Sequence, residues 1–383
     1  MRDAVVVGGG PAGTITAGLL SDGRDVLVIE EHASSGLPVQ CAGILTEEAI
    51  RMCGVKPDIL GKITGADVIF PSGGRFEVRS DCIKALLIDR ADLDRKLAER
   101  AIDRGAEIKY GTRYVSHKVS GTEVSVSTDS GDISSKLIVG ADGHSSRIAM
   151  SVGRNLPREY VYGMGADVRY RSGRDNIMTL RIGSEYAPGF FSWEIPFGDM
   201  MRVGLCIKAG TGSNPNEYLK KLLRVSGIKD CDIISRYSGK IPLGGRRRSY
   251  GDRTLLIGDA AGQVKPISGG GLYPICMAAP ILRDTAEESL LTDRTSSRFL
   301  SRYEEGWKRK IGRELSRGYR IRKIYTGLSD RDLDRVSEII SDDEIRPMLN
   351  GIDLDNPSAV AAPIVRSPRV CMRLLPLMIR AIL

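Results

Sequence analysis

The chain has 383 residues, of which 42% are hydrophobic and 27% are charged, and its formal net charge is +8. These values are typical of a globular protein with two or three domains, and no apolar run reaches the ~18 residues that a membrane-spanning helix needs. Seven cysteines without a C-x-x-C pair, together with only three histidines, argue against a disulfide framework, a zinc site or an iron–sulfur cluster.

The first predicted unit is a strand, a glycine turn, a helix and a second strand, over residues 4–7, 8–13, 14–20 and 25–29. The turn has the spacing G-x-G-x-x-G, and the second strand ends at Glu30. In such a unit Gly8 allows a tight turn, Gly10 lets the backbone approach a pyrophosphate, and Gly13 lets helix and strand pack closely. The helix N-terminus favours phosphates, and the acid binds ribose hydroxyls. The sequence therefore predicts a dinucleotide site here.

The middle of the chain predicts shorter elements. We expect a helix from residue 89, with apolar positions at Leu93, Leu97, Ala101 and Ile102, and strands over 108–110, 114–119, 123–128 and 137–140. Residues 160–210 alternate in the manner of strands, which indicates an antiparallel sheet in a second domain. A buried strand returns at 254–257, and the chain looks helical from about Pro280 onward. The nucleotide-binding domain is therefore expected to be discontinuous.

The block 258–272 is the second strong motif, because it places a strand end, an acid, small residues, a proline and a glycine-rich helix start in order. Asp259 at the strand end can accept hydrogen bonds from ribityl or ribose hydroxyls. The three glycines at 269–271 would direct a helix N-terminus at the pyrimidine edge of a flavin. There the positive end of the helix dipole stabilises the anionic charge of the reduced ring.

The motifs at 8–13 and 258–272, with Glu30 and the pair Asp142-Gly143 between them, resemble the FAD-dependent aromatic hydroxylase superfamily. The resemblance implies an α/β fold: a Rossmann-like FAD-binding domain of the p-hydroxybenzoate hydroxylase type, an inserted antiparallel β-sheet substrate domain and a C-terminal helical region. We expect the FAD-binding domain at 1–65, 82–155 and 245–285, the substrate sheet at 66–81 and 156–244, and the helical region at 286–383.

Three segments are most similar to the geranylgeranyl reductase family, and within it to archaeal enzymes that act on digeranylgeranylglycerophospholipids. Residues 38–43 resemble the family's P-x-x-C-(A/G)-(E/G) stretch beside the flavin, and residues 263–271 resemble its flavin-contact block. Residues 188–196 resemble the P-x-x-Y-x-W-x-F-P sequence of the substrate cavity, with Phe191 in place of the tyrosine and Ile195 in place of the phenylalanine. The same segment also resembles the W-x-W-x-I-P motif of flavin-dependent halogenases.

The resemblance implies which residues contact FAD. At the adenosine and phosphate end we expect Gly8, Gly10, Ala12, Gly13, Glu30, Arg90 and Val115. At the flavin end we expect Cys41, Ala42, Asp259, Pro266, Gly269, Gly270, Gly271 and Leu272. Asp142 is expected to contact the cofactor as well, and no metal is expected. Arg90 matches an R-x-x-L-D pattern and would contact the phosphates, whereas Val115 would present its backbone to the adenine.

The implied reaction is hydrogenation of isolated C=C bonds of geranylgeranyl chains in archaeal-type prenyl ether lipids. Such an alkene has no carbonyl to polarise it, so hydride from the flavin needs a proton delivered nearly in concert. Cys41 is the candidate proton donor and Tyr273 is a second, although a buried cysteine is at least as often an inert small hydrophobe. The aromatic residues Phe190, Phe191 and Trp193 fit the wall of an apolar tunnel, and such a cluster is equally often core packing.

The electron donor stays open between NAD(P)H and a small acidic carrier such as ferredoxin. Residues 294–325 carry eleven Lys/Arg against three Glu. This is either a solvated helical surface or a surface for an acidic carrier, lipid headgroups or a diphosphate. The candidates for carrier binding are Lys308, Arg309, Lys310 and Arg313. The apolar tail 369–383 either caps the core or lies on a membrane.

The start of the first predicted strand near residue 3 leads us to expect no signal peptide and a cytoplasmic protein. A lipid substrate adds the expectation of peripheral contact with the inner face of the cell membrane. No nucleic-acid-binding motif is recognisable and aromatic residues make up 5% of the chain, so a nucleic-acid partner is not expected.

Two other functions stay open. A flavin monooxygenase or halogenase would use the same scaffold, and the ending Ile195-Pro196 favours it slightly. The segment 38–43 and the block 265–271 favour the reductase over that alternative. An electron-transfer flavoprotein belongs to a different class, and it would lack an elongated apolar cavity.

Overall fold

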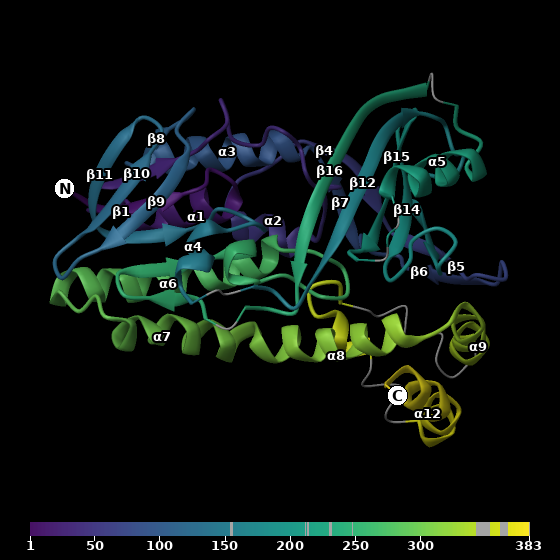
Figure 1. Ribbon diagram of the computed structural model, residues 1–383. Helices are drawn as coiled ribbons and strands as arrows, with labels where there is room; N and C mark the ends of the chain where they lie inside the picture. The colour runs from purple at the N-terminus through teal and green to yellow at the C-terminus, as the bar shows by residue number, and fades with distance from the viewer. Residues whose placement is uncertain are drawn as a thin grey trace.

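The computed structural model describes residues 1–153, 156–210, 212, 214–229, 232–246, 248–341, 353–360 and 367–382. Two large sheets stand side by side, and a long helical run passes beneath both of them (Figure 1). A small third sheet comprises β3 (Ile44–Leu45), β7 (Ala85–Ile88) and β4 (Ile59–Ile63).

The first sheet has a parallel centre. Its strands follow the order β17 (Tyr250–Gly251), β18 (Thr254–Leu256), β11 (Gly131–Gly140), β1 (Arg2–Val7), β2 (Val26–Ile29) and β8 (Glu107–Lys109), and the hairpin of β9 (Tyr114–Val119) and β10 (Val124–Thr128) pairs with β11. Because alternate residues of a strand face opposite sides, Val6 and Val28 pack under helices, whereas Val5 and Leu27 pack under the hairpin. Burial on both faces explains the continuous apolar runs, and the strands predicted in this half are confirmed.

Helices α1 (Pro11–Leu20), α6 (Leu272–Thr292) and α7 (Ser297–Trp307) cover one face of this sheet, and α3 (Arg90–Asp103) packs beside α1. The predicted stripe of α3 is confirmed at Leu93, Leu97 and Ala101, but Ile102 is 49% exposed. Residues four apart share a helix face, and Ile102 lies about 100° around from Ala101. The helix start predicted at the glycines 269–271 is confirmed, because α6 begins at Leu272, and this helix already contains Pro280, from which the chain was expected to look helical.

The second sheet has the order β16 (Ile233–Leu243), β12 (Glu159–Arg169), β15 (Met200–Lys208), β14 (Phe191–Phe197), β13 (Ile177–Ile182), β5 (Gly65–Ile69) and β6 (Arg75–Arg79). Its pairs are antiparallel, apart from β5 with β13. Helix α5 (Pro215–Val225) covers the outer face, where Leu219 and Leu222 pack with Val168 and Val203. The predicted antiparallel sheet is therefore present, and the exact domain limits stay a prediction.

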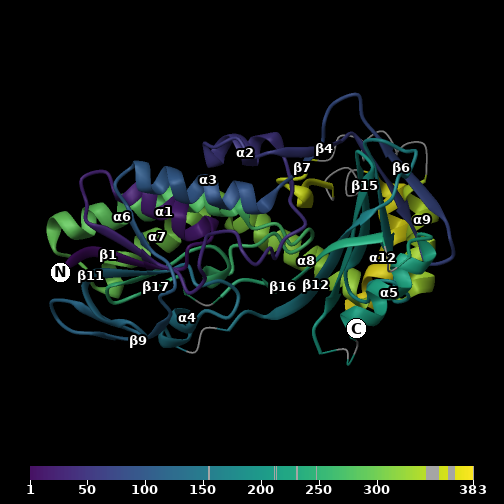
Figure 2. The same cartoon turned by 90° about the horizontal axis from the view of Figure 1, so that it is seen from above.

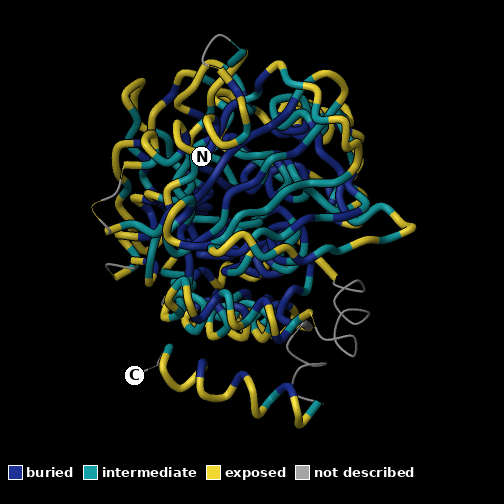
Figure 3. Tube along the Cα trace, turned by 90° about the vertical axis from the view of Figure 1, so that its right-hand side faces the viewer, coloured by how far each residue is buried: buried dark blue, intermediate teal, exposed yellow. Residues whose placement is uncertain are grey.

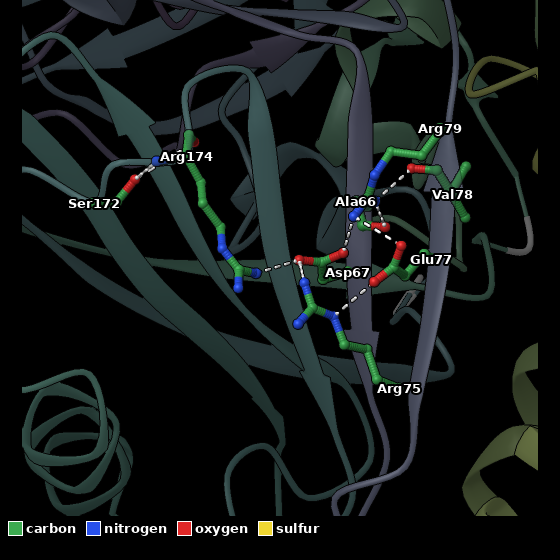
Figure 4. A network of polar contacts seen from close by, with 8 residues as sticks. All are labelled: Ala66, Asp67, Arg75, Glu77, Val78, Arg79, Ser172 and Arg174. Atoms are coloured by element: carbon green, nitrogen blue, oxygen red, sulfur yellow. Dashed lines mark hydrogen bonds and ion pairs between the residues drawn. The ribbon is translucent and has the colours of Figure 1, made fainter.

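One buried carboxylate joins the early strands β5 and β6 to the rest of this sheet. The Asp67 side chain is 1% exposed and is surrounded by Arg75, Arg79 and Arg174 (Figure 4). Arg79 lies 2.6 Å and Arg174 3.0 Å from its carboxylate oxygens. Burial alone would raise the pKa of Asp67, but hydrogen bonds from Arg79 and Arg75 lower it below its usual range. The network holds β5, β6 and the loop before β13 together.

The C-terminal part begins as one run, because α7 continues through the π-helical η3 (Lys308–Gly312) into α8 (Arg313–Gly327). Seen from above, α8 extends from the first sheet toward the second (Figure 2). Next come α9 (Asp330–Ile340), η4 (Pro357–Val360) and α12 (Pro368–Ile382). The predicted helical region also includes 342–352 and 361–366, which lie outside the described residues. None of the helices that the structure describes is long and apolar enough to cross a membrane.

Candidate active site

A turn built from glycine joins β1 to α1. Gly8 has a φ of +108°, and a Cβ there would lie 2.4 Å from the carbonyl oxygen of Ala141. A Cβ on Gly13 would lie 1.9 Å from the carbonyl oxygen of Gly8. Glycine at both positions is what lets α1 approach the sheet this closely. A Cβ on Gly10 would meet nothing within 4 Å, so the turn is open on the side predicted for a pyrophosphate.

Glu30 follows β2 and lies against this turn. Its Oε2 accepts a hydrogen bond from the Gly9 N–H at 2.6 Å, and its Oε1 accepts one from the His32 N–H at 2.9 Å. Only 9% of the residue is exposed. The structure therefore places the predicted ribose-binding acid beside the glycine turn, as the dinucleotide motif requires.

The second glycine block packs directly on the first. A Cβ on Gly258, whose φ is +66°, would lie 2.8 Å from the Cβ of Ala12, so η2 (Gly258–Ala261) touches α1. Asp259 is partly buried, and its Oδ1 lies 3.4 Å from the position of a Cβ on Gly271. Burial raises the pKa of Asp259 to about 6, against the opposing charges of Arg246 and Arg90. Ala12, predicted to contact the pyrophosphate, and Asp259, predicted to contact the flavin end of the same cofactor, thus lie in adjoining segments.

Helices α1 and α6 both begin without a side-chain cap. Each follows a glycine and carries no acidic residue in its first turn. Side chains cap α3, α5, α9, α2 (Glu47–Cys53) and α4 (Arg147–Ser151), whereas α7 also begins without such a cap but follows Ser296 rather than a glycine. The N–H groups of an uncapped first turn bind anionic groups, and the helix dipole adds to this preference. Two open helix ends in adjoining segments fit FAD, which carries a pyrophosphate and a ring that becomes anionic on reduction.

Residues 41–43 lie where the two halves of the molecule meet, the FAD-binding half with the first sheet and the half with the second sheet. Gly43 has a φ of +71°, and a Cβ there would lie 3.1 Å from Arg202 Nη1 and 3.3 Å from Arg90 Cγ. Arg202 Nη1 donates a hydrogen bond to the Ala42 carbonyl oxygen at 2.7 Å. Cys41 Sγ accepts from the Gly43 N–H at 3.4 Å and is an electrostatic partner of Arg90. One arginine from each half therefore holds this loop.

A carboxylate fixes each of these arginines. Within α3, Arg90 Nη2 lies 3.0 Å from Asp94 Oδ1. In the second sheet, Arg202 Nε and Nη2 donate to the two carboxylate oxygens of Asp167 at 2.7 and 2.8 Å, and Arg202 is 8% exposed. Burial raises the pKa of Asp94, and Arg90 opposes that shift. Such bidentate pairs restrict both side chains to one geometry.

Glycines on the inner face of the second sheet make room for two aromatic rings. A Cβ on Gly165 would lie 2.3 Å from the hydroxyl of Tyr237, and a Cβ on Gly204 would lie 2.5 Å from the ring of Trp193. The rings therefore lie directly against the strands. Trp193 Nε1 also donates a hydrogen bond to the Tyr237 hydroxyl at 3.3 Å.

The aromatic residues that the sequence predicted for the substrate cavity form one cluster. Phe190 stacks on Phe191 with centroids 4.6 Å apart, and Phe191 meets Trp193 edge-on at 6.1 Å. Phe190 is 2% exposed, and its Cζ lies 3.6 Å from the position of a Cβ on Gly269. The cluster therefore connects the second sheet with the glycine-rich block 258–272. Its contact with substrate stays a prediction.

Two other predicted cofactor residues have different surroundings. Val115 is 46% exposed on β9, which pairs with β10 alone among the described strands, so its other backbone edge is open. Asp142 accepts hydrogen bonds from Ser146 Oγ at 2.6 Å and from the Ile148 N–H at 3.2 Å. These bonds give Asp142 a local role at the start of α4, and its contact with the cofactor stays a prediction.

Lys265 organises the turn that contains Pro266. Its N–H donates to the Gly270 carbonyl oxygen at 3.0 Å, and its own carbonyl accepts from the Gly269 N–H at 2.8 Å. Lys265 Nζ lies 2.9 Å from Asp355 Oδ1, and these residues are 8% and 5% exposed. This buried ion pair holds the segment 353–360 against the block 258–272. Leu272, at the end of that block, is also buried.

Sequence reasoning missed Arg202, Asp167 and Tyr237. Asp167 had a usable signal, because it continues the alternation of inward-facing positions in 161–167 and is charged where the others are apolar. Tyr237 had no such signal, since its surroundings come from distant strands. The predicted second donor, Tyr273, lies at the start of α6 with its ring 5.8 Å from Lys265 Nζ, and burial raises the pKa of Tyr273.

A pocket of about 580 Å³ opens at the end of β14. It is lined by Leu60, Gly61, Arg171, Asp175, Asn176, Pro196, Phe197, Gly198 and Asp199. The ring of Phe197 has its centroid 5.7 Å from Arg202 Cζ. The side chains of Phe197 and Arg202 therefore separate this pocket from the loop 41–43.

Known proteins resemble both the sequence and the fold. A family model described as an FAD binding domain matches residues 1–169. The chain is 32% identical over 348 residues to digeranylgeranylglycerophospholipid reductase 2 of Methanothermobacter thermautotrophicus, covering 87% of this chain and 90% of that one. It is 30% identical over 374 residues to the protein of the same name from Methanopyrus kandleri, covering 91% and 93%.

A solved structure from Thermoplasma acidophilum, described as geranylgeranyl bacteriochlorophyll reductase-like, has the same fold. Its TM-score is 0.86 at 22% sequence identity, over 98% of this chain and 99% of that one. The predicted fold class and the predicted cofactor, FAD, are confirmed.

Proposed function

The chain belongs to the digeranylgeranylglycerophospholipid reductase family, and from this premise we propose that it hydrogenates C=C bonds of geranylgeranyl chains in prenyl ether lipids, as an FAD-dependent oxidoreductase. The observation that carries the proposal is the loop 41–43, which presents Cys41 between Arg90 of the FAD-binding half and Arg202 of the second sheet. A thiol at this junction can face the cofactor and a substrate on the sheet at the same time.

FAD, when bound and reduced, supplies the hydride. The residues of the chain have three tasks around it. The open ends of α1 and α6, with Glu30 and Asp259, bind the cofactor. The inner face of the second sheet, with Phe190 and Trp193, excludes water and takes the prenyl chain. Cys41 gives a proton to the second alkene carbon, since an unpolarised alkene cannot accept hydride alone.

Mass spectrometry of lipids tests this function. The FAD-loaded protein is incubated anaerobically with dithionite and a digeranylgeranylglycerophospholipid. We expect a gain of two hydrogens for each double bond reduced. Cys41→Ala should lower the rate roughly hundredfold while FAD stays bound, as loss of a general acid does. Cys82→Ala, at an exposed cysteine, is the matched control.

Three outcomes would contradict the function. An unchanged lipid would exclude hydrogenation. A gain of oxygen or halogen, with consumption of O₂ by the reduced protein, would favour the monooxygenase or halogenase. Electron transfer to a quinone without any change in the lipid would favour an electron-transfer flavoprotein.

For the electron donor, the exposed side of η3 and α8 supports an acidic carrier such as ferredoxin over NAD(P)H. Arg309, Lys310 and Arg313 are exposed there and have no ion-pair partner among the described residues, whereas Lys308 pairs with Glu304 at 2.7 Å. The rate of flavin reduction by ferredoxin should fall as salt rises. Lys310→Glu should lower it and Lys118→Glu on β9 should not. A rate of flavin reduction by ferredoxin that does not change with salt would show that this basic surface does not bind the carrier.

For the location, α12 supports a cytoplasmic protein in peripheral contact with the inner face of the cell membrane. Leu374 and Leu377 are buried against α8 and α9, while Met372, Leu375 and Ile379 are 69%, 52% and 49% exposed. Buried and exposed stretches alternate along the C-terminal helix in Figure 3. An apolar face of this kind can lie in the headgroup region of a bilayer. Co-sedimentation with anionic vesicles should weaken when the chain is truncated before residue 368. Unchanged binding would show that α12 is not the membrane contact.

A further inference from the structure

Tyr237 approaches the Cys41 segment from the second sheet. It lies on the inner face of β16, where its ring rests on Gly165 of the neighbouring strand. Two residues further along the same face, a Cβ on Gly239 would lie 2.7 Å from the carbonyl oxygen of Gln40. Glycine at 239 thus lets β16 contact the backbone immediately before Cys41, and Tyr237 shares that face.

The hydrogen bonding of Tyr237 leaves its proton available. An indole N–H can only donate, so the Tyr237 hydroxyl must be the acceptor in its 3.3 Å bond with Trp193. Among the described residues the hydroxyl has no hydrogen-bond acceptor for its own proton. Burial raises the pKa of Tyr237, and the negative charge of Asp167 adds to that shift. The phenol therefore stays protonated near neutral pH and remains a hydrogen-bond donor.

The charged groups that face Tyr237 come from two further strands, β15 and β12. Arg202 Cζ lies 5.9 Å from its ring centroid, and Asp167 pairs with that arginine. The charge of Arg202 opposes the rise in the pKa of Tyr237. The same arginine holds the carbonyl of Ala42, so the phenol and the cysteine loop share one rigid support.

We propose that Tyr237 is a positioning residue for Cys41: its hydroxyl accepts from Trp193, and its own proton, which has no acceptor in the resting structure, is donated to the Cys41 sulfur when the thiolate forms during the reaction. The inference rests on the proposed function, in which Cys41 is the proton donor. During the reaction the S–H bond of Cys41 breaks as its proton forms a C–H bond with one alkene carbon, while the hydride brings the electron pair of the other C–H bond. The thiolate that remains is stabilised by Tyr237 until water returns a proton to it.

The test measures alkylation of Cys41 rather than turnover. The FAD-loaded full chain, without lipid or reductant, is treated with iodoacetamide between pH 6 and 10, and the peptide that contains Cys41 is quantified by mass spectrometry. Tyr237→Phe removes the hydroxyl and keeps the ring on Gly165. We expect it to slow alkylation of Cys41 at pH 7.5 roughly tenfold, because a thiolate that loses a donor forms less readily. Alkylation of the exposed Cys82 should not change.

Two further variants keep the test decisive. Trp193→Phe leaves the Tyr237 hydroxyl without its fixed donor, and we expect a smaller slowing in the same direction. Tyr162→Phe, at a tyrosine of β12 that is 39% exposed, is the matched control and should leave the Cys41 profile unchanged. Unchanged alkylation in both Tyr237→Phe and Trp193→Phe would overturn the proposal, as would equal slowing in Tyr162→Phe. If Tyr237→Phe does not fold, folded Trp193→Phe decides alone.

The two proposals fail independently. Alkylation needs neither lipid nor reductant, so an unchanged profile leaves the reductase function intact. Conversely, a wild-type protein that does not hydrogenate lipid could still show the hydrogen bond between Tyr237 and Cys41.

Discussion

The two sheets of this protein differ in how far along the chain their key contacts extend. In the FAD-binding half, the Gly9 N–H meets Glu30, only 21 residues away, and Arg90 pairs with Asp94 inside one helix. In the second sheet, Arg202 reaches the carbonyl of Ala42 across 160 residues. The cofactor side is thus specified by local motifs, whereas the substrate side depends on tertiary contacts.

The two arginines that hold the loop 41–43 differ in the same way, because Arg90 pairs within one helix and Arg202 pairs between two strands. Arg202→Met leaves Asp167, whose side chain is 18% exposed, without its partner and removes the bond to the Ala42 carbonyl oxygen, so we expect it to lower the free energy of unfolding by about 3–5 kcal/mol. Arg90→Met should cost less, because burial already raises the pKa of Asp94 and this carboxylate can take up a proton when its partner is lost. Denaturant unfolding of both variants measures the difference. An equal loss in the two variants would contradict the view that the tertiary pair is the more important one.

Within the FAD-binding half, two glycines of one turn should respond differently. A Cβ in Gly13→Ala collides with the Gly8 carbonyl, so we expect a loss of about 1–3 kcal/mol in folding stability. Gly10→Ala meets open space and should fold normally, yet bind FAD more weakly because its methyl group enters the pyrophosphate site. Thermal unfolding and flavin absorbance separate the two effects, and equal melting temperatures would show that the turn tolerates the methyl.

The raised pKa of Asp259 makes FAD binding depend on pH. Burial raises this pKa to about 6, and hydroxyl groups of the cofactor would donate to the ionised form. The affinity for FAD should therefore rise about tenfold per pH unit below 6 and level off above it. Fluorescence titration from pH 4.5 to 8 measures this, and Asp259→Asn should flatten the profile. If the affinity of Asp259→Asn for FAD rose with pH as steeply as that of the wild type, a group other than Asp259 would be responsible for the pH dependence.

The smallest change is expected on the exposed side of α12. Ile379→Ser should alter the free energy of unfolding by less than about 0.5 kcal/mol, because the side chain is half exposed. Leu374→Ala, on the buried side, should cost about 2 kcal/mol or more. The informative comparison is vesicle binding, which Ile379→Ser should weaken although stability stays the same. A large loss of stability would instead show that this side is packed.

The difference between the halves also explains what could be predicted. The strand–turn–helix at 2–20, Glu30 and the block 258–272 carry their physical requirements in consecutive residues, so both the fold and the cofactor followed from the sequence. The importance of Cys41 came only from resemblance. Arg202 and Tyr237 could not be assigned, because their partners depend on which strands pair in the second sheet. Ile102 was misplaced because a helical stripe is narrower than the run of apolar residues suggested.

The proposed function places the prenyl substrate between the FAD-binding half and the second sheet. A crystal structure of the FAD-bound protein with a saturated or non-reducible prenyl lipid analogue would test it directly. We expect the prenyl chain on the inner face of β12 and β15, in contact with Trp193 and Cys41. A chain bound on the outer face beside α5, or anywhere away from the loop 41–43, would contradict it.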